Sequence, residues 1–352
     1  MPRPLPPPAE IRSGVHRLLI VKTSSIGDVI HALPVVQAIR QGLPHAAVDW
    51  VVRARSADVL RGNPWVDKLH VLPDSPSIGD LWALRNMLHA ARYDLALDMQ
   101  GLLLSGLITR LSGAPLRVGW DRNREGNALF LTHPIVPGGA RDRHEVDLLY
   151  GFAGALGVPA DHAEFTSQPY LAADGADRAA EWLSNLPRPR VALNVGAGRA
   201  YKRWPLERWG EVASALMGAG VGVVFVGDKN DARDVAKITP GLPDGFADVS
   251  GKTTLRELAS VLAACDLLVS GDSGPMHLAV AVGAPVVALF GATDPRRHGP
   301  YGGRNAVLHD PAPGAMVPGR RPTPEAGAAS LERISVERVV GEVLARLGKC
   351  VG

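Results

Sequence analysis

Residues 271–277 (GDSGPMH) form a turn of small residues between an apolar run and a helical pattern, which suits the binding of a diphosphate. Gly271 and Gly274 permit tight turns with positive φ, and Pro275 suits the first helical turn, where no backbone donor is needed. The helix start then presents free N–H groups and a partial positive charge. Asp272 would repel phosphate, so we expect it to bind a sugar or ribose hydroxyl; a plain helix cap is the alternative.

A second turn, residues 24–28 (SSIGD), also follows an apolar run and opens a helical pattern. Asp28 falls in the first helical turn, and His31 follows one turn later on the same face. A carboxylate at the carboxyl end of a strand could act as a general base. The alternatives are a helix cap for Asp28 and a packed or surface histidine for His31.

A third segment, residues 194–205 (NVGAGRAYKRWP), contributes cations. Lys202 and Arg203 could neutralise a leaving diphosphate. Gly196 and Gly198 give G-x-G without a third glycine, so the dinucleotide fingerprint is incomplete.

Other catalytic motifs are incomplete or missing. Residues 251–254 (GKTT) resemble the tail of a P-loop, but Gly245 stands one residue too far upstream. The sequence has no HExxH, no paired Cys/His set and no GxSxG. We therefore expect no metal, no cofactor and no serine-hydrolase chemistry.

The elements that must position these residues alternate between strand and helix, twice over. A length of 352 residues is enough for two domains. Short connections between alternating elements predict parallel sheets covered by helices, hence two Rossmann-like α/β units. The predicted strands are 15–21, 47–52, 68–72 and 94–98 in the first half and 191–195, 221–226, 266–270 and 285–290 in the second.

Composition narrows the function classes. The chain has 38 Lys and Arg residues and 35 Asp and Glu residues, so its net charge is +3. The electrostatic field of so small a charge is too weak to suggest nucleic acid as a partner. Two cysteines, Cys265 and Cys350, make no disulfide framework, which favours a reducing, cytoplasmic compartment. The longest apolar stretch, 278–292, is broken by Gly283 and Pro285 and predicts a helix end and a strand in place of a membrane span.

Taken together, five segments resemble glycosyltransferase family 9, the lipopolysaccharide heptosyltransferases, and most of all the type I members. They are residues 22–34 (KTSSIGDVIHALP), 98–102 (DMQGL), 202–205 (KRWP), 271–277 (GDSGPMH) and 291–295 (GATDP), within a likeness over roughly 16–310. The resemblance implies a GT-B type α/β fold, with two Rossmann-like domains facing each other across a cleft.

The resemblance also assigns roles to the domains. It implies an acceptor domain over 15–165 and a donor domain over 191–335, joined by a linker over 166–190. Residues 1–14 are expected to be a disordered Pro-rich arm. The helix in 336–352 is expected to pack back on the N-terminal domain.

The activity implied is inverting transfer of L-glycero-D-manno-heptose from ADP-heptose to a 3-deoxy-D-manno-oct-2-ulosonic acid (Kdo) residue of the lipopolysaccharide inner core. The partners would be ADP-heptose and Kdo-lipid A, with peripheral contact at the cytoplasmic face of the inner membrane. An inverting transfer needs one carboxylate base, and cations with a helix N-terminus can stabilise departing ADP without a metal.

The residues that match the family's motifs take their expected roles from it. Asp28 resembles the general base, Lys202 the residue that meets the diphosphate, and Asp272 the residue that binds heptose hydroxyls. The remaining expected donor contacts are Ser273, Gly274 and His277 at the diphosphate, Thr253 at the nucleoside and Asp231 at the ribose.

Expected acceptor contacts are Ser25 and Gly27 in the first turn, with Arg124 and His144 from a basic stretch over 117–144. That stretch could meet anionic Kdo and lipid A phosphates, or it could be a solvated basic face. The chain departs from the family at Leu104, where members often carry Lys or Arg, and over residues 311–328.

Three other functions remain open. One is a family 9 glycosyltransferase with a different sugar or acceptor, and a second is a nucleotide-sugar epimerase of the same architecture. The third is a nucleotide-sugar-binding protein that has lost its base, against which the presence of Asp28 argues.

Overall fold

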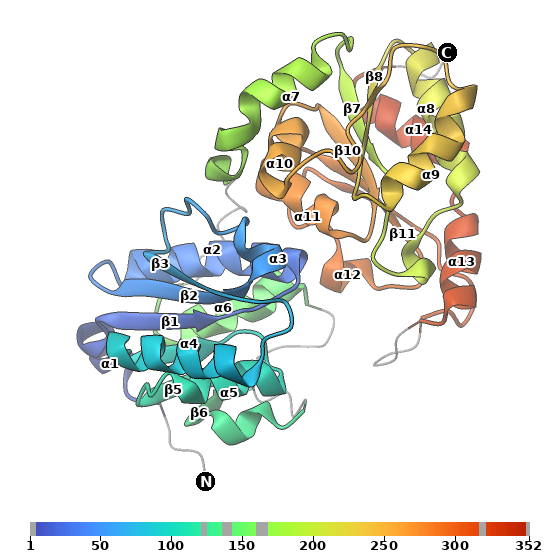
Figure 1. Ribbon diagram of the computed structural model, residues 1–352. Coiled ribbons are helices and arrows are strands. Elements are labelled where there is room, and N and C mark those ends of the chain that lie inside the picture. The colour runs from blue at the N-terminus through green and yellow to red at the C-terminus, as the bar shows by residue number, and fades with distance from the viewer. Residues whose placement is uncertain (1–4, 121–124, 136–142, 160–167, 317–321, 350–352) are drawn as a thin grey trace. The chain divides into compact units, whose positions relative to one another are not determined.

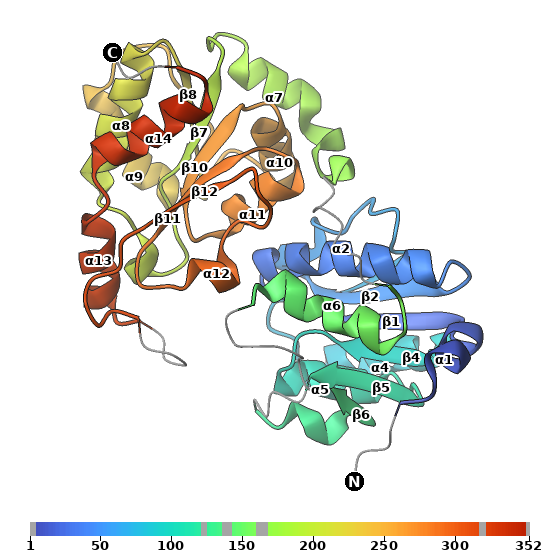
Figure 2. The ribbon, with the colours of Figure 1, turned by 180° about the vertical axis from the view of Figure 1, so that it is seen from behind.

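A computed structural model describes residues 5–120, 125–135, 143–159, 168–316 and 322–349. The chain divides into two compact units, Met1–Glu164 and Phe165–Gly352. Each unit is built on a parallel sheet with helices on both faces (Figures 1 and 2), and each sheet has six strands within the described residues. No helix in the described part of the chain is both long and apolar enough to cross a membrane.

The first unit has the strand order β3-β2-β1-β4-β5-β6. Its central strand is a continuous apolar run in which Leu18 to Val21 are fully buried, as expected for a parallel strand covered on both faces. The strands are β1 (Arg17–Val21), β2 (Ala47–Arg53), β3 (Lys68–Leu72), β4 (Leu95–Asp98), β5 (Leu116–Trp120) and β6 (His133–Ile135).

Two layers of helices cover this sheet. Helices α2 (Ile26–Gly42) and α6 (Glu145–Ala155) pack together on one face (Figure 2), and α4 (Ile78–Ala91) and α5 (Leu103–Leu111) lie on the other (Figure 1). Leu84 and Leu88 of α4 and Ile108 of α5 are buried against Leu19 and Val21 of β1. The short elements α3 (Ala54–Ala57) and η1 (Asn127–Phe130) complete the unit.

The second unit repeats this arrangement with the order β12-β11-β10-β7-β8-β9. Its strands are β7 (Arg190–Asn194), β8 (Gly222–Val226), β9 (Ala247–Asp248), β10 (Leu267–Gly271), β11 (Val286–Phe290) and β12 (Ala306–His309). Its main helices are α7 (Ala176–Leu183), α8 (Leu206–Gly218), α9 (Asp231–Ile238), α10 (Leu255–Ala263), α11 (Gly274–Ala281), α13 (Pro324–Glu332) and α14 (Val336–Arg346).

Both sheets contain a point where the strand order reverses, between β1 and β4 and between β7 and β10. Ligands of open α/β sheets bind outside the carboxyl ends of the strands at such a switch point. Residues that follow β1 and β4, or β7 and β10, are therefore the first place to look for a site in each unit.

The prediction of a disordered N-terminal arm is wrong for the described part of that segment. Helix α1 (Pro8–Gly14) begins at a proline, which suits the first helical turn. Its Ile11 is buried, and the Arg12 Nη1 donates to the Gly157 carbonyl at 2.9 Å. This helix therefore packs against the end of α6, while residues 1–4 lie outside the described residues.

The predicted linker belongs to the second unit. Helix α7 and the preceding η2 (Pro169–Gly175) pack on α10. The Ser260 hydroxyl of α10 donates to the Ala172 carbonyl at 2.8 Å, and Arg256 Nη2 donates to the Tyr170 carbonyl at 2.6 Å. The described part of 166–190 is thus folded against the second sheet's helices, and residues 166–167 are not described.

The last helix packs on the core of the second unit. Val339, Val343 and Leu344 of α14 are buried in the core of the second unit, beside α8. The turn before α14 is fixed by the Trp204 Nε1, which donates to the Ile334 carbonyl at 3.1 Å. The apolar face of α14 is therefore used within its own unit.

Candidate functional site

In the first unit, Asp28 lies at the start of α2, directly after the turn that follows β1. Its Oδ2 accepts hydrogen bonds from the Ser25 amide at 2.9 Å and from the Ser25 hydroxyl at 2.8 Å. This is the carboxylate half of a capping box, so the cap interpretation holds for one carboxylate oxygen. The side chain as a whole remains 39% exposed.

Lys22 is a residue of this site that the sequence analysis assigned no role. Its Nζ lies 3.8 Å from the Asp28 Oδ1 and donates to the Met99 carbonyl at 3.0 Å. The side chain is only 2% exposed, and the Lys22 carbonyl accepts from the Trp50 Nε1 at 2.9 Å. A lysine directly after a strand buried on both faces was the signal that could have identified it.

The segment DMQGL braces the same turn from across the switch point. The Gln100 Oε1 accepts from the amides of Thr23 at 3.0 Å and Ser24 at 3.2 Å. Asp98 is fully buried, and its Oδ1 accepts from the Gly101 amide at 2.9 Å. Burial raises the pKa of Asp98, and this hydrogen bond from Gly101 opposes the rise. The segment's first role is thus to hold the turn that carries Asp28.

Two histidines lie beside this turn. His31, one turn after Asp28, is buried, and its ring centroid is 5.2 Å from that of His144. His144 caps α6, with its Nδ1 accepting from the Val146 amide at 3.2 Å. The packing of α2 on α6 therefore brings His144 to the helix that carries Asp28. The expected role of His144 as an acceptor contact requires this proximity.

The other predicted acceptor contacts differ in their surroundings. Ser25 is exposed at the helix start, whereas Gly27 is buried. Arg117 of the basic stretch is used within the fold, because its Nε and Nη1 donate to the carbonyls of Phe130 at 2.9 Å and Ala114 at 2.7 Å. Arg124 lies outside the described residues.

In the second unit, an ion pair joins loops that follow β7 and β10. The Lys202 Nζ lies 2.6 Å from the Asp272 Oδ2, and their side chains are 21% and 7% exposed. A Cβ on Gly271 would approach the Lys202 carbonyl to 3.0 Å, so glycine there permits the two loops to meet. The structure thus brings together two residues that the sequence analysis assigned to different parts of a donor.

A buried polar cluster fixes the start of α11 beside this ion pair. The Asn194 Nδ2, at the end of β7, lies 3.0 Å from both the Ser270 and the Ser273 hydroxyl oxygens. Those two hydroxyl oxygens are 2.9 Å apart. Ser273 is the N-cap residue of α11, yet its side chain makes no cap hydrogen bond. The first-turn amides of α11 are therefore not satisfied by the cap side chain, which suits the binding of an anion.

Asp231 lies at the start of α9 and is linked to the loop after β7. Its Oδ2 accepts from the Asp228 amide at 2.9 Å, and its Oδ1 lies 3.4 Å from the Arg203 Nη2. Burial raises the pKa of Asp231, and the Asp228 amide opposes the rise. A Cβ on Gly196 would come within 2.1 Å of the Asp231 carboxylate, so this close approach requires the glycine.

The remaining predicted donor contacts follow neighbouring strands. His277 lies in α11, and its side chain is nearly buried. Thr253 is half-buried just before α10, where Thr254 is the N-cap residue. The Gly251 amide, donating to the Gly227 carbonyl at 2.9 Å, connects the loop before Thr253 to the loop after β8.

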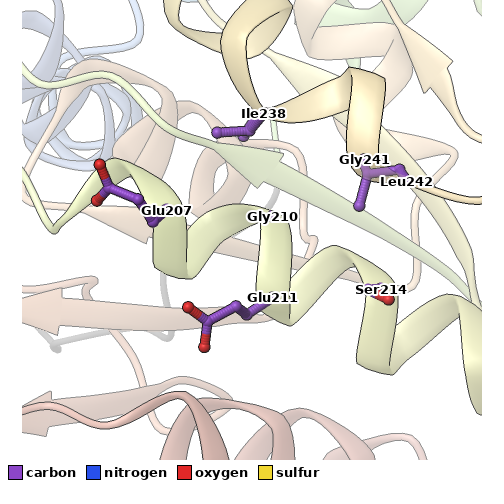
Figure 3. Close-up of a pocket in the computed structure, with 7 residues that line it drawn as sticks. All are labelled: Glu207, Gly210, Glu211, Ser214, Ile238, Gly241 and Leu242. Atoms are coloured by element: carbon purple, nitrogen blue, oxygen red, sulfur yellow. The ribbon is translucent and has the colours of Figure 1, made fainter.

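Two further observations limit what the site can hold. Within the described residues, no group of three or more His, Cys, Asp or Glu side chains could bind a metal ion. A hollow on the second unit lies between α8 and the segment from α9 to η4 (Thr239–Gly241) (Figure 3), and none of the predicted site residues lines it. It is lined by Glu207, Gly210, Glu211, Ser214, Ile238, Gly241 and Leu242.

Comparison with known proteins shows which family the chain resembles. The sequence pattern of glycosyltransferase family 9 (heptosyltransferase) matches residues 81–317. Lipopolysaccharide heptosyltransferase 1 of Escherichia coli K12 is 33% identical over 317 residues, which cover 84% of this chain and 94% of that protein. Lipopolysaccharide core heptosyltransferase OpsX of Haemophilus influenzae is 28% identical over 343 residues, 93% of this chain and 95% of that protein.

A similar solved structure is that of E. coli heptosyltransferase WaaC with ADP, which is 27% identical. The superposition has a TM-score of 0.72 and covers 94% of this chain and 99% of the other. The predicted fold class, two Rossmann-like α/β domains of the GT-B type, is confirmed by the two sheets and by this likeness.

Proposed function

Because the chain belongs to glycosyltransferase family 9, we propose that it transfers L-glycero-D-manno-heptose from ADP-heptose to a Kdo residue of the lipopolysaccharide inner core. The family makes it a glycosyltransferase, and the identity of sugar and acceptor is the proposal. The observation that carries it is the ion pair between Lys202 and Asp272 beside the α11 N-terminus, because it supplies separate groups for diphosphate and sugar.

The donor diphosphate binds at the start of α11. Ser273 and Gly274 begin the helix, whose first amides donate to phosphate oxygens, and the Lys202 ammonium neutralises the charge that develops on departing ADP. His277 lies one turn further along the same helix. Support comes from the buried cluster at Asn194, which keeps the Ser273 hydroxyl from capping these amides.

The sugar and nucleoside contacts follow from the neighbouring loops. When a diphosphate takes Lys202 as its counter-ion, the Asp272 carboxylate is released to accept hydrogen bonds from heptose hydroxyls. Thr253 and Asp231 follow β9 and β8, and we assign them to the nucleoside and the ribose. Asp231 would then contact the ribose while remaining linked to Arg203.

Asp28 is the general base of the proposed reaction. Its Oδ1 takes the proton of the acceptor hydroxyl while that oxygen bonds to the anomeric carbon of heptose. The bond from that carbon to the diphosphate breaks, and its electron pair leaves with ADP. Attack opposite the leaving group inverts the configuration and requires one carboxylate, a role that we assign to Asp28 at the first switch point.

The proposed acceptor is Kdo on lipid A. Ser25 and Gly27 at the α2 start, His144 at the α6 start and Arg124 are assigned to it, since the described members of this set surround the turn that carries Asp28. Because lipid A resides in a bilayer, the reaction is placed at the cytoplasmic face of the inner membrane through peripheral contact.

A donor and acceptor screen tests this proposal. The purified protein is incubated with ADP-heptose, GDP-mannose or UDP-glucose, each with and without Kdo-lipid A. Glycolipid products are identified by mass spectrometry, and the nucleotide sugars are examined by NMR for a change of configuration. We expect heptosylated Kdo-lipid A only from ADP-heptose. Transfer from another nucleotide sugar would support a different family 9 activity, and a donor isomer formed without acceptor would support an epimerase.

A further inference from the structure

The buried lysine beside the catalytic carboxylate has no role in the proposed reaction so far. Lys22 is 2% exposed, and its Nζ donates to the Met99 carbonyl at 3.0 Å while lying 3.8 Å from the Asp28 Oδ1. A buried ammonium is costly unless it is paired and hydrogen-bonded. Its position between the loops after β1 and β4 therefore reflects a specific pairing at the switch point.

We propose that Lys22 is a positioning residue that directs the Asp28 Oδ1 toward the acceptor hydroxyl. This inference rests on the proposed role of Asp28 as the base. The two carboxylate oxygens have distinct partners, since Oδ2 is held by the Ser25 amide and hydroxyl whereas Oδ1 faces Lys22. The reactive oxygen is thus Oδ1.

The separation of 3.8 Å is important for this role. It exceeds the range of a good hydrogen bond, so the ammonium attracts Oδ1 without occupying its lone pairs. A short hydrogen bond would instead make the carboxylate a poorer base. The Met99 carbonyl holds the ammonium at this distance, because Lys22 cannot move closer to Asp28 without giving up that bond.

Two other titratable side chains, both histidines, belong to the elements around this turn. His31 lies one turn along α2, and His144 packs on it from α6. Lys22, directly after β1, forms an ion pair with Asp28.

A double-mutant cycle between Lys22 and Asp28 tests the inference. The single variants Lys22→Met and Asp28→Asn and the double variant are assayed for transfer from ADP-heptose to Kdo-lipid A. We expect Lys22→Met to lower kcat by about 10–100-fold, as for a misplaced catalytic group, with KM for ADP-heptose unchanged. In the Asp28→Asn background the same change should have no further effect, because Lys22 acts through that carboxylate.

Three controls distinguish positioning from folding. Lys22→Gln can still donate to the Met99 carbonyl, so it should keep the stability of the wild type but show the same loss of kcat. Lys68→Met removes an exposed lysine from the same unit and should leave kcat unchanged. As a third control, KM for ADP-heptose should stay unchanged in both Lys22→Gln and Lys68→Met.

The outcomes separate this inference from the proposed function. If Asp28→Asn shows a large but measurable loss of kcat and the effects of Lys22 and Asp28 multiply in the double variant, the positioning role is wrong and the base assignment stands. Activity of Lys22→Gln within threefold of wild type would also overturn the inference. If Asp28→Asn itself transfers heptose at the wild-type rate, the proposed function is wrong. The inference about Lys22 then fails with it, because it rests on the role of Asp28 as the base.

Discussion

The Lys202 ammonium and the Asp272 carboxylate lie 2.6 Å apart at the second switch point. The ammonium neutralises the nearly buried Asp272 carboxylate at the place where a diphosphate is proposed to bind. Asp272 and the diphosphate therefore compete for one cation. Donor binding is expected to replace the carboxylate with phosphate, leaving Asp272 to the sugar.

Replacing Asp272 with Asn tests this competition. Without the carboxylate, Lys202 is available to phosphate and the local repulsion is removed, so ADP should bind at least as tightly as to wild type. Turnover of ADP-heptose should nevertheless fall by about 100-fold, because the sugar loses a charged hydrogen-bond acceptor. Calorimetric titration with ADP and steady-state kinetics with ADP-heptose measure the two effects.

The matched controls for that variant are Asp310→Asn and Lys202→Met. Asp310 forms an ion pair with Arg333 elsewhere in the same unit, so its loss should change neither quantity. Lys202→Met should weaken ADP binding. If Asp272→Asn weakened ADP binding as much as Lys202→Met, the exchange of partners would be wrong.

Asn194 is predicted to set the affinity for ADP through the start of α11. In Asn194→Asp, a carboxylate replaces the amide beside Ser270 and Ser273. The added negative charge should weaken ADP binding by about tenfold or more, since it opposes the helix N-terminus. Asn194→Ala should chiefly lower stability, by about 1–3 kcal/mol, because it leaves buried hydroxyls without their donor.

Thermal unfolding and ADP titration of both Asn194 variants distinguish these effects. Asn86→Asp, at an exposed position of α4, is the control for added charge. Equal ADP affinity in Asn194→Asp and wild type would contradict a diphosphate at the α11 start.

Asp49 should make stability depend on acid pH. Its Oδ2 accepts from the Tyr93 hydroxyl at 2.6 Å and the Arg17 Nη2 at 3.2 Å, with the His70 Nε2 at 3.7 Å. Burial raises the pKa of Asp49, but the bonds with His70 and Tyr93 and the charge of Arg17 outweigh it, so the pKa lies below its usual value. A depressed pKa contributes stability above the unfolded-state value of about 3.9, and this is lost as the pH falls through the native value.

Replacing Asp49 with Asn should lower the free energy of unfolding at pH 7 by about 1–3 kcal/mol. The difference from wild type should narrow below about pH 4. Urea denaturation at both pH values measures it, with Asp58→Asn in an exposed ion pair as the control. A difference that stays constant with pH would contradict the role of the ionised carboxylate.

Helix α14 is predicted to stabilise the second unit. Leu344 is 3% exposed in a core shared with Val343 and with Leu216 of α8. Leu344→Ala should therefore lower the free energy of unfolding by about 2–5 kcal/mol. Thermal unfolding should show a lower Tm for Leu344→Ala and little change for the exposed Arg338→Ala. An unchanged Tm in Leu344→Ala would contradict the packing of α14 on this core.

The strands that carry the site were predictable from sequence because their burial is continuous. β1, β7 and β10 are apolar runs with helical patterns after them, and they lie within one residue or two of the predicted ranges. The residues after them could be located for the same reason. Strand order and the two switch points depend on pairing between distant segments, which periodicity does not show.

The missed elements lack such a signal. β6 has three residues, β12 is only partly buried, and α9 is a short helix with many charged residues. Helix α6 follows a segment rich in Arg and Gly, which obscured its start at His144. In α14 the apolar stripe was visible, but a stripe does not identify the core that it packs against.

Contacts within the site were the least predictable. Lys22 and Asp28 are six residues apart, yet their pairing depends on the Met99 carbonyl in the loop after β4. Lys202 and Asp272 meet only because β7 pairs with β10. The motifs showed which residue types were present. The sheet determines which of them meet.

The most direct test of this account compares wild type with Asp28→Asn in heptose transfer from ADP-heptose to Kdo-lipid A. ADP affinity is measured in parallel to show that the second unit is intact. The account predicts that Asp28→Asn binds ADP as wild type does but loses about 100- to 10,000-fold in kcat, the usual contribution of a general base. Transfer by Asp28→Asn at a rate near that of wild type would contradict it.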